Sequence, residues 1–222
     1  MTTPLTSEAL AASGYAFMPR FAVGASAIEA ASLLGCVDPV EGLDPVQTLV
    51  PRSRARAAPN TYSGIFGESE FPLHTDLAHW ALPPRFLVLR CLFGSTSVGT
   101  RVLDGRELLD HFGASTLRRA LVHPRRPMRN GKQLLRLLQC TDNSEFCLRW
   151  DSVYLQPASK CGADVFNRIR AFLRDPSVAE VTLANPGDTL VLDNWRCLHG
   201  RSGVPQTALD RYIERVYLKG LR

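Results

Sequence analysis

Two observations predict a mainly β fold with flanking helices (α+β). Short runs rich in β-branched and aromatic residues dominate the second half of the chain, and turn sequences such as Asn185-Pro186-Gly187-Asp188 separate them. Helical patterns are few, and they do not alternate with strands as in a parallel βαβ sheet. Together these features indicate a sandwich, a barrel or a jelly roll. With 222 residues and no internal repeat, the chain fits one domain, 1–222.

The elements can be placed in order along the chain. In the N-terminal helical part, 1–50, Ser26 and Glu29 form a capping box before AIEAASLL, and Gly35 is expected to end that helix in a left-handed conformation. The proline-flanked segment 51–60 reads as an exposed loop. Further helices are expected at 106–112, 116–121 and 163–173, and strands at 86–92, 146–150, 153–156, 181–184, 189–192 and 212–218.

Composition excludes several classes of protein. Hydrophobic residues make up 45% and charged residues 21%, the balance of a globular chain rather than a disordered one. No run of 18 apolar residues and no signal-peptide pattern occurs, so we expect a cytoplasmic protein with no membrane span, and its six cysteines as free thiols. The net charge of +5 is too mild to indicate a nucleic-acid partner by itself.

One stretch, 118–136, carries seven basic residues and no acidic one. They are Arg118, Arg119, Arg125, Arg126, Arg129, Lys132 and Arg136. Two interpretations stay open: a solvated surface segment, which is what most charge runs are, or a docking face for an acidic partner such as a carrier protein, a phosphorylated substrate or an RNA. No aromatic-rich basic strand accompanies the arginines, so nucleic acid is the weakest of these partners.

A candidate metal site is divided between two distant segments. In FPLHTD, His74 and Asp76 project to the same side of an extended segment because they are two residues apart. His199 follows a strand that begins after a Pro-Gly turn. Two histidines and one carboxylate form the facial triad of non-haem Fe(II) oxygenases, which leaves three coordination positions open.

Four sequence blocks carry a more specific resemblance. The blocks FPLHTDLAHWALPPRFLVLRCL, GTRVLDG, NPGDTLVLDNWRCLHGRSG and RYIERVYL span 71–218, about two thirds of the chain. In this order they resemble the TauD/TfdA-like group of Fe(II)/2-oxoglutarate-dependent oxygenases. The resemblance implies a double-stranded β-helix core, 71–218, with iron on His74, Asp76 and His199. It also implies that Arg211, helped by Thr100, binds the distal carboxylate of 2-oxoglutarate.

The resemblance also implies a reaction. Such an enzyme uses O₂ to oxidise an unactivated C–H bond of its substrate and releases succinate and CO₂. Halogenating relatives carry a small residue where this chain has Asp76, so hydroxylation is the expected outcome, with desaturation and cyclisation left open. No catalytic residue is expected beyond the metal site.

Substrate-binding candidates follow from the same resemblance. Arg215 shares a strand face with Arg211 and is a candidate for a substrate carboxylate or phosphonate, with a plain surface arginine as the alternative. Asn60, Tyr62 and Ser63 precede the first block, where the resemblance implies a loop over the substrate; ordinary exposed turn residues are the alternative.

Three functions therefore stay open. A small metabolite such as a free amino acid is the first substrate expected, because of Arg215. The same chemistry on a carrier-tethered acyl or aminoacyl group is the second, because of the basic stretch 118–136. A non-catalytic metal-binding jelly-roll protein is the alternative of another class. No sequence pattern indicates an oligomeric state.

Overall fold

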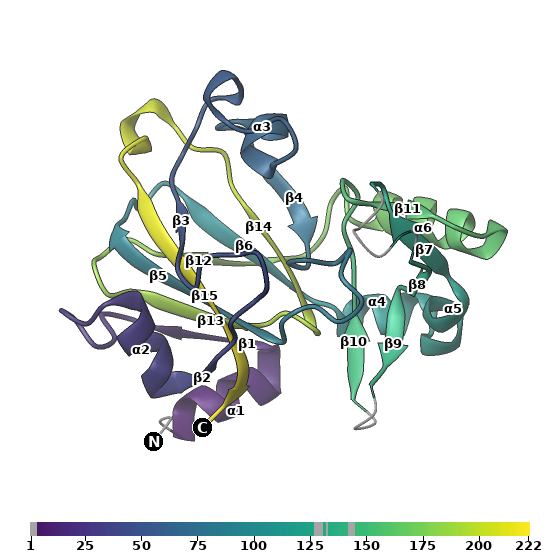
Figure 1. Cartoon of the computed structure of the whole chain (residues 1–222), viewed down its shortest axis with the longest axis horizontal. Helices are drawn as coiled ribbons and strands as arrows, with labels where there is room; N and C mark the ends of the chain where they lie inside the picture. The colour runs from purple at the N-terminus through teal and green to yellow at the C-terminus, as the bar shows by residue number, and fades with distance from the viewer. Residues whose placement is uncertain (1–3, 127–130, 132, 142–144) are drawn as a thin grey trace.

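Two antiparallel sheets form most of the protein in the computed structural model, which describes residues 4–126, 131, 133–141 and 145–222 (Figure 1). The larger sheet has the order β1 (Tyr15–Met18), β13 (Thr189–Asp193), β5 (Phe86–Phe93), β15 (Tyr212–Leu221) and β2 (Gly35–Val37), with β3 (Gln47–Leu49) also paired to β15. The smaller sheet has the order β12 (Ala179–Thr182), β6 (Gly99–Asp104), β14 (Cys197–Arg201) and β4 (Phe71–His74). The mainly β class expected from the sequence is confirmed.

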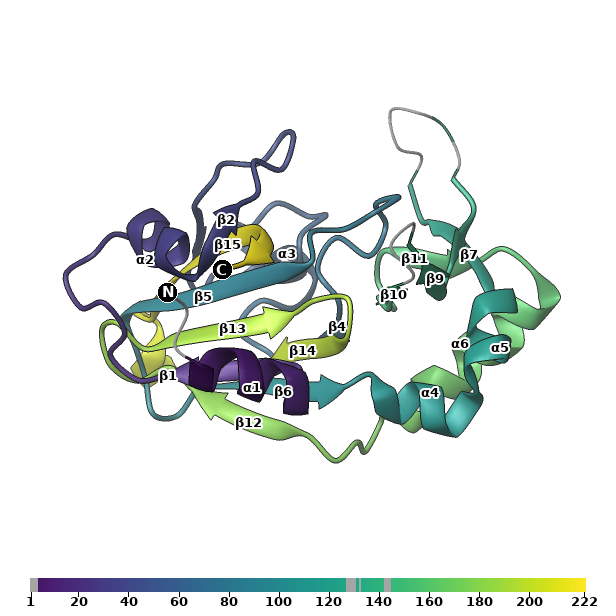
Figure 2. The ribbon, with the colours of Figure 1, turned by 90° about the horizontal axis from the view of Figure 1, so that it is seen from below.

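The two sheets lie face to face, and alternation along β5 explains why (Figure 2). Leu87 and Leu89 are buried against the smaller sheet, where Val102 is one of their neighbours in the core cluster. Phe86 and Val88, on the other face of β5, belong to a second core cluster. Successive side chains of a strand point to opposite faces, so this run of apolar residues fits a strand that is buried on both sides.

Helices cover the outer face of the larger sheet. Leu10 of α1 (Pro4–Ser13) and Leu34 of α2 (Ala27–Leu34) belong to the same buried cluster as Val88. Helix α2 begins at the expected capping box: Ser26 Oγ accepts a hydrogen bond from the Glu29 N–H, and the Glu29 carboxylate accepts one from the Ser26 N–H.

The expectation for Gly35 was wrong. Its φ is −174° and its ψ −166°, so the backbone is extended, and Gly35 is the first residue of β2 rather than a left-handed turn. A Cβ at this position would collide with the carbonyl of Gly220 on β15. The glycine is therefore required by the close approach of two paired strands.

A second lobe with its own core is inserted between β6 and β12, and it lies beside the sandwich in Figure 1. Its elements are α4 (Arg106–Phe112), α5 (Ala114–Arg119), β7 (Leu121–Pro124), β8 (Leu135–Arg136), β9 (Leu138–Cys140), β10 (Phe146–Leu148), β11 (Leu155–Pro157) and α6 (Lys160–Phe172). Leu117, Trp150 and Phe166 lie in its core cluster, which continues into the sandwich through Leu103 and Leu198. The expected helices 116–121 and 163–173 are present but begin two to three residues earlier.

The N-terminal segment is not only helical. Residues 1–50 contribute β1, β2 and β3 to the larger sheet as well as two helices. One continuous sheet therefore joins this segment to the 71–218 core. The remaining short elements are η1 (Arg54–Arg56), α3 (Tyr62–Phe66) and η2 (Gln206–Ala208).

A buried arginine fixes the chain just after the His-x-Asp segment. Arg149 is 0% exposed, and its guanidinium donates hydrogen bonds to the carbonyls of Ala78, Trp80 and Ala81 and to Gln139 Oε1. Arg149→Met is expected to lower the free energy of unfolding by about 3 kcal/mol, because it leaves several buried carbonyls without donors. Urea unfolding measures this loss.

The matched control is Arg168→Met. Arg168 is exposed on α6, and its ion-pair partner Asp164 is exposed as well. This change should cost less than about 0.5 kcal/mol. Equal losses in the two variants would contradict the role assigned to Arg149.

Candidate metal centre and cavity

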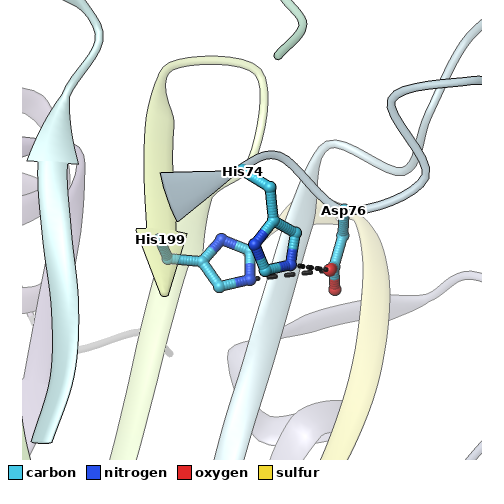
Figure 3. A group of neighbouring side chains, drawn as sticks. All are labelled: His74, Asp76 and His199. Carbon is cyan, nitrogen blue, oxygen red and sulfur yellow. Dashed lines mark ion pairs between the residues drawn. The ribbon is translucent and has the colours of Figure 1, made fainter. Parts of the chain in front are cut away.

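Two neighbouring strands bring the candidate metal ligands together. His74 ends β4 and is the direct register partner of His199 on β14. Asp76 follows two residues after His74, and its Oδ1 lies 3.5 Å from Nε2 of each histidine. Figure 3 shows the three side chains pointing toward one another, and their ligand atoms all lie within 4.8 Å of each other. All three are buried, and this set of donors fits a divalent first-row metal.

Hydrogen bonds fix the ring of His74 and the backbone of Asp76. Nδ1 of His74 lies 2.8 Å from the Pro72 carbonyl oxygen, so Nδ1–H donates to it and Nε2 is the ring atom left to bind a metal. Asn194 Oδ1 accepts a hydrogen bond of 2.7 Å from the backbone N–H of Asp76. Nδ1 of His199 has no partner among the described residues.

The pKa values of the three clustered side chains are shifted in different directions. Burial alone would raise the pKa of Asp76, but Arg215 and the two histidines outweigh it and hold that pKa well below its usual range. Burial alone would lower the pKa of His74, but hydrogen bonding to Asp76 outweighs it and raises that pKa. Burial lowers the pKa of His199. The carboxylate therefore stays ionised, and a proton that competes with a metal is held at His74.

A cavity of about 750 Å³ opens over the cluster. Every site residue expected from the sequence lines it: His74, Asp76, His199, Arg211, Thr100, Arg215, Asn60, Tyr62 and Ser63. The volume lies within the range usual for small-molecule sites.

Arg211 is a buried cation with no counter-ion among the described residues. It is 6% exposed, and its guanidinium makes no hydrogen bond or ion pair with any described residue; Nε is fully buried without a partner. Burial lowers its pKa to about 10. An unpaired buried charge is costly, so this arginine fits an anionic ligand supplied from outside. Thr100, on β6, is 4% exposed and lines the same cavity.

Arg215 lines the cavity but is not free. Its Nη1 donates a hydrogen bond of 2.7 Å to Asp76 Oδ2, and its Nε donates one of 2.9 Å to Gln47 Oε1. Only Nη2 has no partner among the described residues. Tyr217, two residues further along β15, donates a second hydrogen bond to Asp76 Oδ2, at 3.0 Å.

The segment before β4 lies against the metal cluster; it was expected to be a loop, but from Tyr62 onward it is the short helix α3. The ring of Tyr62 stacks on the imidazole of His74, with centroids 4.2 Å apart and an interplanar angle of 24°. The backbone carbonyl of Asn60 accepts a hydrogen bond of 2.7 Å from the Tyr154 hydroxyl, which ties the loop to the second lobe. Ser63, next to Tyr62 on α3, also lines the cavity.

Asp151 is a cavity residue that sequence reasoning missed. It is 2% exposed, has no ion-pair partner among the described residues, and burial raises its pKa. Its Oδ1 accepts hydrogen bonds from the backbone N–H groups of Val153 and Tyr154, at 2.6 and 2.8 Å. The only sequence signal is an aspartate after a strand, which is typical of any turn. Tyr217 was also missed, although its spacing of two from Arg215 on a strand could have indicated it.

Fold and cluster together define a jelly-roll protein with a candidate two-histidine, one-carboxylate metal site. Three solved structures have this fold. Asparagine oxygenase with Fe(II), (2S,3S)-3-hydroxyasparagine and succinate matches with a TM-score of 0.66 and 21% identity, over 93% of this chain and 74% of that chain. PvcB from Pseudomonas aeruginosa matches with a TM-score of 0.64 and 19% identity, over 96% of this chain and 78% of that chain, and OrfP with Fe, succinate and (3S)-hydroxy-L-Arg matches with a TM-score of 0.65 and 19% identity, over 96% and 77% of the two chains.

Comparison of the sequence alone finds no related protein or family. No family model matches the chain, and no curated protein matches it. At identities of 19 to 21%, the structural likeness shows the fold. Among the described residues, the helices are too short or too polar to cross a membrane.

Proposed function

We propose that the chain is an Fe(II)- and 2-oxoglutarate-dependent oxygenase that hydroxylates an unactivated C–H bond of a small, amino-acid-like metabolite. One observation carries the proposal: the His74, Asp76 and His199 cluster shares a cavity with the buried, unpaired guanidinium of Arg211. A dicarboxylate that binds the metal at one end and pairs with the guanidinium of Arg211 at the other would fit both groups.

In this assignment the chain's residues hold three components. His74, Asp76 and His199 would bind Fe(II), and Arg211 with Thr100 would pair with the distal carboxylate of 2-oxoglutarate. When bound, Fe(II), 2-oxoglutarate and O₂ supply an oxidation that places one oxygen atom on the substrate and the other in succinate, with release of CO₂. The protein decides which substrate hydrogen is presented.

The substrate class follows from two further charges in the cavity. Nη2 of Arg215 has no partner among the described residues and can donate to a carboxylate, and Asp151 is a buried carboxylate that makes no ion pair with any described residue. A zwitterion such as a free amino acid complements both groups. The bound molecules named for asparagine oxygenase and OrfP are hydroxylated amino acids, which supports the same class here.

Anaerobic titration with Fe(II) and 2-oxoglutarate tests the proposal. The chelate of the two gives a weak visible charge-transfer band, which should be absent in His74→Ala. With O₂ admitted, amino acids are then screened for substrate-dependent succinate release. If wild type binds iron but gives neither the band nor succinate, the non-catalytic metal-binding jelly roll becomes the leading explanation.

Asp151→Asn tests the substrate assignment separately. Asparagine keeps the oxygen that accepts hydrogen bonds from Val153 and Tyr154, so the turn is retained while the charge is removed. The KM for an amino-acid substrate is expected to rise at least about tenfold, because a substrate ammonium loses its buried partner. Steady-state succinate formation measures this.

The KM for 2-oxoglutarate is the internal control, and it should stay unchanged. A matched variant, Asp164→Asn, removes an exposed carboxylate on α6 and should leave both constants at their wild-type values. If Asp151→Asn leaves the KM for the amino acid unchanged, Asp151 serves only the turn.

A second candidate is a carrier-tethered acyl or aminoacyl substrate. Of the basic stretch 118–136, exposed Arg125 and Arg126 line the cavity, as does exposed Arg52 from the loop across it. Arg118 instead lies over the Phe146 ring. The remaining basic residues of the stretch are Arg119, Arg136, Arg129 and Lys132, of which Arg129 and Lys132 lie outside the described residues. Turnover that requires an acidic carrier protein and falls steeply with salt would favour this candidate over the free metabolite.

A further inference from the structure

The two oxygens of Asp76 have different environments. Oδ1 faces Nε2 of both histidines at 3.5 Å, in the centre of the metal cluster. Oδ2 accepts two hydrogen bonds from strand β15, at 2.7 Å from Arg215 Nη1 and at 3.0 Å from the Tyr217 hydroxyl. The carboxylate is therefore held so that one oxygen faces the histidines and the other faces β15.

Both donors are themselves fixed in place. Arg215 is anchored a second time, through Nε, on Gln47 of β3. Tyr217 is 1% exposed and packs in the core between the two sheets, so its hydroxyl has little freedom to move. The two residues are two positions apart on β15 and so project to the same face of the strand.

We propose that Tyr217, together with Arg215, is a positioning residue that makes Asp76 a one-oxygen metal ligand. The inference rests on the metal site of the proposed function. A carboxylate oxygen that accepts two hydrogen bonds, one of them from a cation, is poorly available to a metal. Asp76 would therefore offer a metal one oxygen instead of two, which would leave more of the metal's positions to co-substrate and O₂. The sequence motif itself does not determine whether one or both oxygens of Asp76 bind a metal.

Tyr217→Phe tests the proposal, with Co(II) as the probe and visible absorption as the readout. Loss of the hydroxyl should weaken Co(II) binding about tenfold, the usual effect of removing a hydrogen bond to a metal ligand. It should also lower the intensity of the Co(II) d–d bands, because an Asp76 that turns to chelate raises the coordination number. Arg215→Gln, which removes the other donor, should change both readouts in the same direction.

Tyr212→Phe is the matched control. It makes the same chemical change on the same strand, but the Tyr212 hydroxyl contacts Thr48 instead of Asp76. Its affinity and spectrum should equal those of wild type. Wild-type affinity and spectrum in both Tyr217→Phe and Arg215→Gln would overturn the positioning role. If wild type binds Co(II) no better than His74→Ala, the metal site itself fails, and the proposed function and the positioning role fall together.

Discussion

Arg211→Met is expected to raise the KM for 2-oxoglutarate at least about 100-fold while leaving the folded protein as stable as wild type or more stable. A carboxylate that loses a buried guanidinium partner loses roughly 3 kcal/mol or more of binding free energy, and each 1.4 kcal/mol corresponds to a factor of ten. In the absence of ligand the same guanidinium is buried without a partner among the described residues, so removing its charge should add about 1 kcal/mol to the free energy of unfolding. Succinate kinetics and urea unfolding measure the two effects.

Arg90→Met separates this expectation from the general effect of losing a buried arginine. Arg90 is 2% exposed, but its guanidinium donates to the carbonyls of Phe21, Ala22 and Ala25. Its replacement should therefore lower stability without changing the KM for 2-oxoglutarate. If Arg211→Met behaves as Arg90→Met does, Arg211 is a structural residue and the co-substrate assignment is wrong.

The strands and the metal cluster could be predicted because their signals are local. Runs such as 86–92 and 189–192 have the composition of buried strands, and the structure places β5 and β13 there within one residue. His74 and Asp76 project together because of their spacing on an extended segment. His199 could be joined to them only through the resemblance, since the β4–β14 pairing that makes the histidines neighbours is non-local.

The features that could not be predicted from the sequence depend on contacts with segments that are distant along the chain. Gly35 has the residue type of a helix C-cap, but the carbonyl of Gly220, 185 positions away, decides its conformation. In the sequence Asp151 resembles any turn aspartate, and only the folded structure shows that it lines the cavity. Arg215 was expected to meet a substrate, whereas the structure shows part of its guanidinium already engaged by Asp76. In each case a long-range contact adds the information.

The second large effect concerns metal binding. His74→Ala is expected to reduce Co(II) or Fe(II) binding and substrate-dependent succinate release to background, because a single histidine and one carboxylate leave too few ligands to hold the ion. Anaerobic metal titration measures the binding. His123→Ala is the control, since His123 lies on β7 in the second lobe and its Nδ1 contacts the neighbouring Pro124 carbonyl. Metal binding retained in His74→Ala would exclude His74 as a ligand.

The pH dependence of wild-type metal binding provides a finer test of the same site. A metal must displace the proton on His74, whose pKa is raised above the ordinary 6.5. The other two ligands do not compete in this way, because the lowered pKa of His199 keeps its ring neutral and the lowered pKa of Asp76 keeps its carboxylate ionised. Affinity for Co(II) should therefore begin to fall while the pH is still above 6.5, and then decrease about tenfold per pH unit, the slope for release of one proton. A slope of two protons would mean that both histidines are charged before the metal binds. An onset below pH 6.5 would show that Asp76 does not stabilise the imidazolium of His74, and the geometry of the cluster would then differ from the one in Figure 3.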